Sequence, residues 1–241
     1  MNNYKLTISY DGNHFYGFQK QPKHLTVQEA IETALEKLLK SYKLTYAGRT
    51  DRGVHAKQQI VSIITNEILE DSFKESLNAL VGSHIHIKKI LLVKKNFHPR
   101  YDAKLRTYKY LVNTPNNYEP YNIGYSYFIK HELIIHELNL IANSFVGKKN
   151  FTNYSKLRID QNPIREITES KWTKNKQYFI YTITGNSFLH NMVRSIVGVQ
   201  LAVVDGKLSR ESVYASLETP LTERFKYVAP PDGLYLWKIK Y

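Results

Sequence analysis

The sequence contains no cysteine and no long uninterrupted hydrophobic run. Without cysteine there can be no disulfides or thiolate metal sites, which fits a reducing compartment such as the cytoplasm. No apolar stretch reaches the roughly 20 residues needed to cross a bilayer. The first residues, MNNYKLTISYDG, lack the apolar region of a signal peptide. We therefore expect a cytoplasmic protein with no membrane attachment.

Acidic residues are scarce relative to basic ones. Lys and Arg number 34 and Asp and Glu number 21, so the net charge over 241 residues is +13. A charge of this size attracts polyanions, of which nucleic acid is the commonest. The 19 tyrosines supply rings that can stack on bases beside phosphate contacts. A lysine-rich solubilising surface would give the same charge, so composition alone leaves both interpretations open.

Hydrophobic periodicity indicates alternating strands and helices in the first part of the chain. Apolar residues alternate with polar ones over 4–10, as in a half-buried strand. Thr26, with Glu29 three residues later, forms a capping box that predicts the start of a helix. Another strand is expected over 58–65, then a helix near 72–80 and a strand at HIHIKKILLV.

The second part of the chain repeats this order. Strands are expected near 104–113, 164–173, 177–185 and 234–241, and helices at ELNLIANSFVG, from about Leu189 and from about Ser209. We predict an α+β fold of two related α/β halves around a continuous, mostly antiparallel sheet with helices on one side. The predicted halves are residues 1–103 and 104–241.

The segment GRTDRG carries the most chemistry. It places Asp51 between Arg49 and Arg52, with Gly48 and Gly53 at the two ends. The glycines allow a sharp turn that presents one side chain. Neighbouring guanidinium groups favour an ionised carboxylate, which can act as a nucleophile. A structural Asp–Arg pair in a tight turn explains the same spacing.

His55 lies four residues after Asp51, a spacing that raises the possibility of a metal pair. No third ligand follows nearby, and no HExxH motif occurs in the chain. We therefore predict no metal site here and expect His55 to form hydrogen bonds within the loop.

Three later segments supply cations and rings. In AKLRTYKYLV, strand alternation puts Lys104, Arg106, Tyr108 and Tyr110 on one face, which is either a platform for an unstacked base or an ordinary solvent face. In NSFLHNMVRSIVG, an apolar stripe at helical spacing leaves His190 and Arg194 at its edge.

Arg194 can pair with a buried carboxylate from that position, or extend its charged end to solvent. The last strand, LYLWKIKY, has Leu234 and Leu236 on the same face, which is either the floor of a base pocket or plain core.

These segments together closely resemble the tRNA pseudouridine synthase A family. The resemblance rests on YDGNHFYGFQKQ, YAGRTDRGVHAKQQ, FHPRYDAKLRTYKY, FTNY, NSFLHNMVRSIVG and APPDGLYL, and it spans nearly the whole chain. It implies isomerisation of uridines 38, 39 and 40 in the anticodon arm of tRNA to pseudouridine. It also implies that no cofactor is needed, and that the enzyme is a homodimer in which one tRNA contacts both subunits.

The resemblance also implies roles for individual residues. Asp51 matches the catalytic aspartate. Matching substrate-binding positions are Tyr108, which packs on the base; Arg194, which pairs with the aspartate; Arg49, which displaces the base; and Leu234, which lines the pocket. We place His55 with these substrate-binding residues.

Four positions depart from the family pattern, namely Phe18, Arg52, Pro99 and Asn191. Arg52 adds charge next to Asp51 and is expected to alter the contact with tRNA. The alternatives from other classes are a non-catalytic basic RNA-binding module, which has no need of Asp51, Tyr108 and Arg194 together, and a metal-dependent nuclease, for which clustered carboxylates are lacking.

Overall fold

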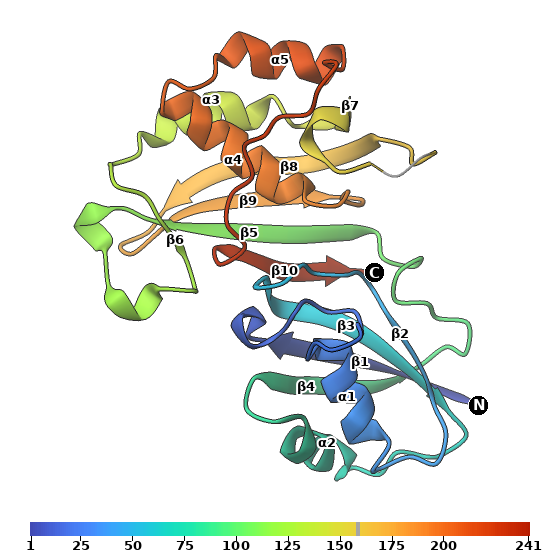
Figure 1. The fold of residues 1–241 in the computed structure, drawn as a ribbon. Coiled ribbons are helices and arrows are strands. Elements are labelled where there is room, and N and C mark those ends of the chain that lie inside the picture. Colours follow the sequence, from blue (N-terminus) through green and yellow to red (C-terminus); the bar gives the residue numbers. More distant parts are fainter. Residues whose placement is uncertain (158–159) are drawn as a thin grey trace. The chain divides into compact units, whose positions relative to one another are not determined.

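The computed structural model describes residues 1–157 and 160–241, and these form two compact units (Figure 1). Unit 1 comprises Met1–Lys104 and Tyr235–Tyr241, and unit 2 comprises Leu105–Leu234. The last seven residues of the chain therefore return to unit 1, a connection that periodicity along the sequence does not specify.

Unit 1 contains a sheet and two helices. Its elements are β1 (Asn2–Tyr10), the short helical turn η1 (Gly12–His14), α1 (Val27–Leu35), β2 (Lys43–Tyr46), β3 (His55–Thr65), α2 (Phe73–Val81), β4 (Ile85–Val93) and all but the first residue of β10 (Leu234–Lys240). β1 pairs with β4 on one side and with β3 on the other, both antiparallel. The other edge of β3 pairs with β2 in antiparallel orientation. The first two residues of β3, His55 and Ala56, pair in parallel with β10 on the same edge.

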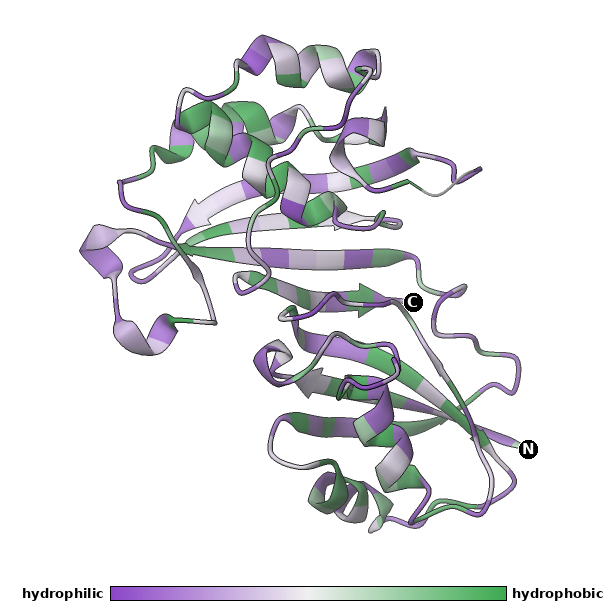
Figure 2. Cartoon of the chain, in the orientation of Figure 1, coloured by the Kyte–Doolittle hydropathy of each residue, from purple (hydrophilic) through white to green (hydrophobic). Residues whose placement is uncertain are grey.

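One face of the unit 1 sheet is covered and the other is partly open. Along β1, Tyr4, Leu6, Ile8 and Tyr10 are buried, whereas the residues between them remain partly exposed. This alternation confirms the predicted period of two in β1. α2 packs on β4 and on α1. Hydrophobic and hydrophilic segments both occur along the strands (Figure 2).

The first helix begins where the capping box predicts. The side chain of Thr26 accepts a hydrogen bond from the backbone N–H of Glu29, at 3.3 Å. The helix ends at Leu35, although its apolar stripe continues to Leu39. The backbone N–H groups of Leu38 and Leu39 both donate to the Leu35 carbonyl, so a tight turn replaces the next helical turn.

Unit 2 also combines a sheet with helices on it. Its elements are β5 (Leu105–Asn113), η2 (Pro115–Asn117), η3 (Pro120–Asn122), β6 (Tyr127–Phe128), α3 (Ile135–Asn143), β7 (Gly147–Asn150), η4 (Thr152–Tyr154), β8 (Ile164–Lys174), β9 (Phe179–Gly185), α4 (Met192–Val204) and α5 (Arg210–Glu218). β9 pairs antiparallel with β5 and β8, and β8 pairs antiparallel with β7. β6 adds a short parallel pairing to β5.

The core of unit 2 is rich in aromatic rings. Its fully buried large side chains are Tyr110, Phe145, Phe151, Tyr154, Phe179 and Tyr181. Burial raises the pKa of Tyr154 and Tyr181, and each hydroxyl has a hydrogen-bond partner, in Ser216 and Ser170 respectively. Many of the abundant tyrosines therefore belong to the core.

The α+β class and the mostly antiparallel pairing within each unit are confirmed. Two helix boundaries were wrong. The helix predicted to end at Gly147 ends at Asn143, and Gly147 begins β7. α4 begins at Met192, because Asn191 has a left-handed backbone with φ 62° that breaks the helical repeat, so Leu189 and His190 precede the helix. No helix in the described parts of the chain has both the length and the apolar character to cross a membrane.

Candidate active site

Asp51 lies in the loop between β2 and β3, and hydrogen bonds fix the backbone of this loop. The N–H of Phe18 donates to the Thr50 carbonyl at 3.1 Å, and the N–H of Val54 donates to the Asp51 carbonyl at 3.1 Å. The Thr50 side chain is buried, with its hydroxyl 2.7 Å from that of Tyr10. Asp51 itself is only half-buried. The loop therefore presents a partly accessible carboxylate from a backbone anchored on both sides.

Two glycines outside the loop allow other backbone to approach it closely. Gly17 has φ +87°, and a Cβ at this position would lie 2.7 Å from the Thr50 carbonyl oxygen. A Cβ on Gly12 would overlap the carbonyl oxygen of Val54. Sequence reasoning missed both residues. Gly12 lies in the segment YDG and Gly17 in YGFQ. Neither segment indicates by itself that it contacts the Asp51 loop, because the loop is distant in sequence.

The glycines within the loop differ in their importance. Gly53 has φ 78°, as the predicted sharp turn requires. Gly48 is not among the positive-φ residues, and a Cβ there would meet nothing within 4 Å. The expectation that Gly48 supplies special conformational freedom was therefore wrong.

His55 is the first residue of β3, and only 2% of it is exposed. Its Nδ1 accepts a hydrogen bond from the N–H of Gly12 at 3.1 Å, and its ring stacks on Tyr235 with centroids 4.6 Å apart. Asp11 Oδ1 also lies 3.3 Å from Nδ1. One nitrogen cannot both accept from Gly12 and donate to Asp11, and the buried Gly12 N–H is the better defined partner.

The two arginines of the loop are both exposed, and Arg52 belongs to a three-layer stack. Its guanidinium lies 4.2 Å from the centre of the Tyr16 ring. On Tyr16 stacks His24, with centroids 4.0 Å apart and planes inclined by 6°. A guanidinium over an aromatic face is stabilised electrostatically. This chain thus builds a flat cationic surface beside Asp51, which sequence reasoning missed.

In unit 2, β5 carries two members of the predicted face, Arg106 and Tyr108, both half-buried. Tyr110 is fully buried, and Lys104 precedes the strand. Arg106 donates to the Asn186 carbonyl at 2.6 Å, and the Tyr108 ring meets the edge of Phe188 with centroids 5.1 Å apart. Asn186 and Phe188 lie between β9 and α4. The segment before α4 therefore packs on this face of β5, and Phe188 is a further ring beside Tyr108 that sequence reasoning did not select.

Arg194 lies in the first turn of α4 and is half-buried. Its Nε donates to the Ala229 carbonyl at 2.8 Å, and the N–H of Ala229 donates back to the Arg194 carbonyl at 3.0 Å. This reciprocal pair sets the position of the guanidinium.

The segment 229–234 contacts Arg194 and β5, and Leu234 is its last residue. The Tyr110 hydroxyl donates to the Pro230 carbonyl at 2.8 Å, and the N–H of Leu111 donates to the Gly233 carbonyl at 2.8 Å. Leu234 is buried, and its N–H donates to the Pro231 carbonyl. Burial raises the pKa of Tyr110 well above its ordinary value, and nearby Arg194 opposes the shift.

The predicted site residues thus form two groups. Arg49, Asp51 and His55 lie on or beside one anchored loop of unit 1, whereas Tyr108, Arg194 and Leu234 belong to unit 2. Each group is ordered by buried backbone bonds. The contact of Asp51 with Tyr108 and Arg194 stays a prediction.

Comparison with known proteins gives a single answer. A family model described as tRNA pseudouridine synthase matches residues 6–102 and 141–241. The tRNA pseudouridine synthase A of Borrelia duttonii is 38% identical over 240 residues, and that of Borreliella burgdorferi strain ZS7 is 38% identical over 242, with 97% of each chain covered. The protein of the same name from Thermosipho melanesiensis is 36% identical over 243 residues, with 99% of each chain covered. The chain therefore belongs to the tRNA pseudouridine synthase family and is an isomerase that acts on tRNA.

Proposed function

We propose that this enzyme converts uridines 38, 39 and 40 of the tRNA anticodon stem-loop to pseudouridine, with Asp51 as the nucleophile. The observation that carries the proposal is the presentation of Asp51. It is a half-buried carboxylate between two exposed arginines, on a loop held by Phe18 and Tyr10. A partly accessible carboxylate repels phosphate, which weighs against a role for the loop in RNA binding alone.

The reaction exchanges one glycosidic bond for another. The C1′–N1 bond breaks, the uracil turns, and a C1′–C5 bond forms, while the proton on C5 is lost and N1 gains one. Attack of the Asp51 carboxylate on C1′ would release the uracil as an anion and leave a glycosyl ester. C5 of the turned base would then attack C1′ and release Asp51. Attack at C6 and removal of a sugar proton are the alternative roles for the same carboxylate.

The target nucleotide must leave its stack before these atoms become accessible. Extruding a base costs about a few kcal/mol. Arg49 is exposed on the loop next to Asp51, so it is placed to occupy the vacated space and to contact phosphate. The adjacent stack of Arg52 on Tyr16 offers a cationic surface for the neighbouring nucleotides.

The residues of unit 2 would confine and orient the extruded base. Tyr108 would stack on the uracil, and Leu234 would cover its other side and exclude water from the glycosyl intermediate. Arg194, fixed through Ala229, would pair with the Asp51 carboxylate and aim it. His55 would support the loop from below, because its ring is buried against Tyr235.

We further propose that the enzyme acts in the cytoplasm as a homodimer, without a cofactor. Sedimentation equilibrium of the purified chain tests the dimer, and a mass of about 28 kDa at every concentration would contradict it.

Mapping pseudouridine in tRNA tests the substrate positions. In tRNA from cells that lack this protein, we expect pseudouridine to be lost at positions 38, 39 and 40 and kept in the other arms. The wild-type gene should restore it, and Asp51→Asn should not. Unchanged modification at all three positions, or loss from another arm, would contradict the proposal.

A further inference from the structure

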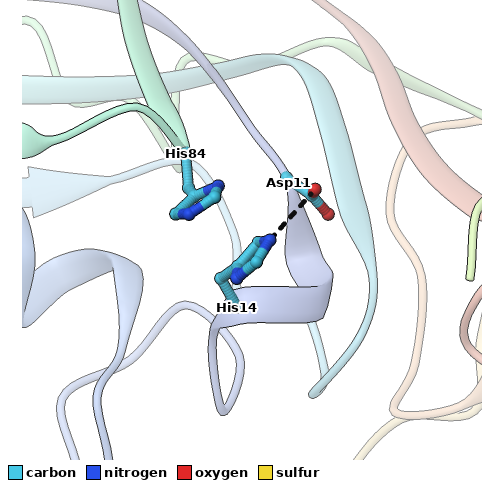
Figure 3. Close-up of side chains that lie close together, drawn as sticks. All are labelled: Asp11, His14 and His84. Carbon is cyan, nitrogen blue, oxygen red and sulfur yellow. Dashed lines mark ion pairs between the residues drawn. The ribbon is translucent and has the colours of Figure 1, made fainter.

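We propose that Asp11, His14 and His84 form a binding site for a divalent transition-metal ion of the zinc type. The three side chains come from the end of β1, from η1 and from the residue before β4 (Figure 3). Their potential ligand atoms all lie within 4.8 Å of one another. This cluster does not include Asp51 or His55, although Asp11 Oδ1 lies 3.3 Å from His55 Nδ1, and it has no step in the proposed reaction.

The backbone brings the three residues together independently of any ion. β1 and β4 pair up to Tyr10 and Ile85, so Asp11 and His84 extend the ends of neighbouring antiparallel strands. The Asp11 N–H donates to the His84 carbonyl at 3.0 Å, which continues the ladder by one bond. The η1 turn then carries His14 back over Asp11. Only side-chain torsions therefore need to change for the ligand atoms to converge.

The donor set is suited to a particular class of cation. Two imidazoles and one carboxylate favour Zn²⁺, Co²⁺ or Ni²⁺ over Mg²⁺ and Ca²⁺, which prefer oxygen ligands alone. The two carboxylate oxygens of Asp11 have different partners, and one of them lies near His14. Oδ1 accepts from the N–H of Asn13 at 3.1 Å, while Oδ2 lies 3.6 Å from Nε2 of His14. Three protein ligands leave a fourth, water-filled position in a tetrahedral site.

Binding requires one rearrangement. The rings of His14 and His84 are stacked, with centroids 3.4 Å apart and planes inclined by 16°, so their lone pairs do not yet point to one centre. Ligands of a tetrahedral zinc ion lie about 3.3 Å apart, given metal–ligand distances near 2.0 Å. Both imidazoles are exposed, so they can turn about χ1 and χ2 without displacing core. When an ion binds, the rings of His14 and His84 would therefore separate and coordinate it together with Asp11.

The proposed ion would strengthen a part of unit 1 next to the candidate active site. It would join the end of β1 to the start of β4 through side chains as well as backbone. Gly12, between two of the ligands in the turn, donates to His55 at the foot of the Asp51 loop. The effect expected is on stability, because a ligand that binds only the folded chain shifts the folding equilibrium.

Titration of the purified chain with Zn²⁺ alone tests the site. We expect one equivalent to bind wild-type protein with a heat that isothermal calorimetry resolves, and to raise Tm. His14→Gln and His84→Gln should each weaken binding by about tenfold or more and abolish the rise in Tm. His86→Gln is the matched control, because His86 is an exposed histidine two residues further along and outside the cluster.

His14→Gln and His84→Gln both change exposed side chains. Circular dichroism before titration verifies that the two variants fold. Equal Zn²⁺ affinity in wild type, His86→Gln and His14→Gln would overturn the proposal. So would wild-type protein that binds no Zn²⁺. An affinity loss in His86→Gln as large as in His84→Gln would place the ion elsewhere and would also overturn it.

Discussion

Asp51 owes its position to residues that are distant in sequence. The loop backbone is anchored by Phe18, and Gly17 passes so close to Thr50 that no side chain fits between them. The left-handed φ of Gly17 adds a second requirement for glycine. The carboxylate is thus positioned by the segment after η1 as much as by its own motif.

Gly17→Ala tests this dependence. The new Cβ would meet the Thr50 carbonyl oxygen at 2.7 Å and would impose a left-handed backbone on alanine. We expect a loss of about 2 kcal/mol in the free energy of unfolding, measured by urea denaturation. We also expect a drop in kcat with little change in tRNA affinity, because the clash displaces the backbone that carries Asp51.

Gly48→Ala is the matched control for that prediction. Its Cβ would meet nothing within 4 Å, and no positive φ is required. A change within about 0.5 kcal/mol is expected. If Gly48→Ala and Gly17→Ala had equal effects, the anchoring role of Gly17 would be refuted.

Single residues also show where sequence reasoning ends. The GRTDRG motif correctly predicted a sharp turn at Gly53, because a glycine beside charged residues is a local signal. It did not distinguish Gly53 from Gly48, and it could not reveal Gly17. The need for glycine there arises from a contact across more than 30 residues of chain, and such contacts leave no periodic pattern.

Among the elements, α4 and the segment 227–234 depend on each other. Gly198 lies in the middle of α4, and a Cβ there would approach the Tyr227 carbonyl oxygen to 2.7 Å. One turn earlier, Arg194 exchanges two hydrogen bonds with Ala229. The close approach at Gly198 therefore lets the segment reach Arg194.

Gly198→Ala should destabilise the protein although alanine favours helices. Alanine gains about 1 kcal/mol over glycine inside a helix, whereas forcing extra volume into a packed contact costs about 1–3 kcal/mol. We expect a net loss of about 1 kcal/mol by urea denaturation, together with reduced kcat because Arg194 loses its anchor. A more stable variant with normal kcat would show that the contact is not tight.

The pairing of β8 with β9 includes a carboxylate that responds to pH. Hydrogen bonds hold the pKa of Glu169 below its ordinary value of 4.5, first from Lys171 and then from Thr184, and Lys109 adds to the effect. A depressed pKa means that the contribution to stability is present above the ordinary value and is lost as pH falls through the folded-state value. The Glu169 side chain is 36% exposed, so solvent screening keeps the contribution small.

Glu169→Gln should therefore lower the free energy of unfolding by about 0.5 kcal/mol at pH 7. The difference from wild type should shrink as the pH falls below 4.5. Urea denaturation at a series of pH values measures it. If the difference in free energy of unfolding stayed constant down to low pH, it would arise from lost packing and not from the charge of Glu169.

Long elements were predictable and short ones were not. β1, β3, β5, β8 and β9 all have the period-two pattern or apolar composition of strands. β2, β6 and β7 have two to four residues each and were missed. β7 reads GKKN, which has no apolar pattern at all, and it exists because β8 offers it a free edge to pair with.

At the scale of the whole molecule, the family was the property that the sequence predicted best. The motifs in their order indicated the tRNA pseudouridine synthase family, and the family model and relatives confirm it. The return of residues 235–241 to unit 1 was not predictable, because a terminal strand can pair with any compatible edge. The meeting of Asp51 with Tyr108 and Arg194 stays a prediction for the same reason.

The net charge of +13 makes the affinity for tRNA dependent on salt. Each phosphate contact contributes about one to the slope of log K against log salt concentration. Arg52→Gln should reduce that slope by about one and weaken binding at low salt, because it removes the cation stacked on Tyr16. Filter binding over a salt series measures the slope. Lys74→Gln, on α2 and paired with Glu75, is the control and should leave it unchanged.

Release of tritium from tRNA labelled at C5 of uridine tests the central claim most directly, because the label leaves only when C5 becomes bonded to C1′. We expect release with wild-type protein and with Asp71→Asn, which changes an exposed carboxylate elsewhere in unit 1. Asp51→Asn should release none while binding tRNA within about twofold of wild type. Appreciable release by Asp51→Asn would contradict its role as the nucleophile, and no release by wild-type protein would contradict the enzymatic function.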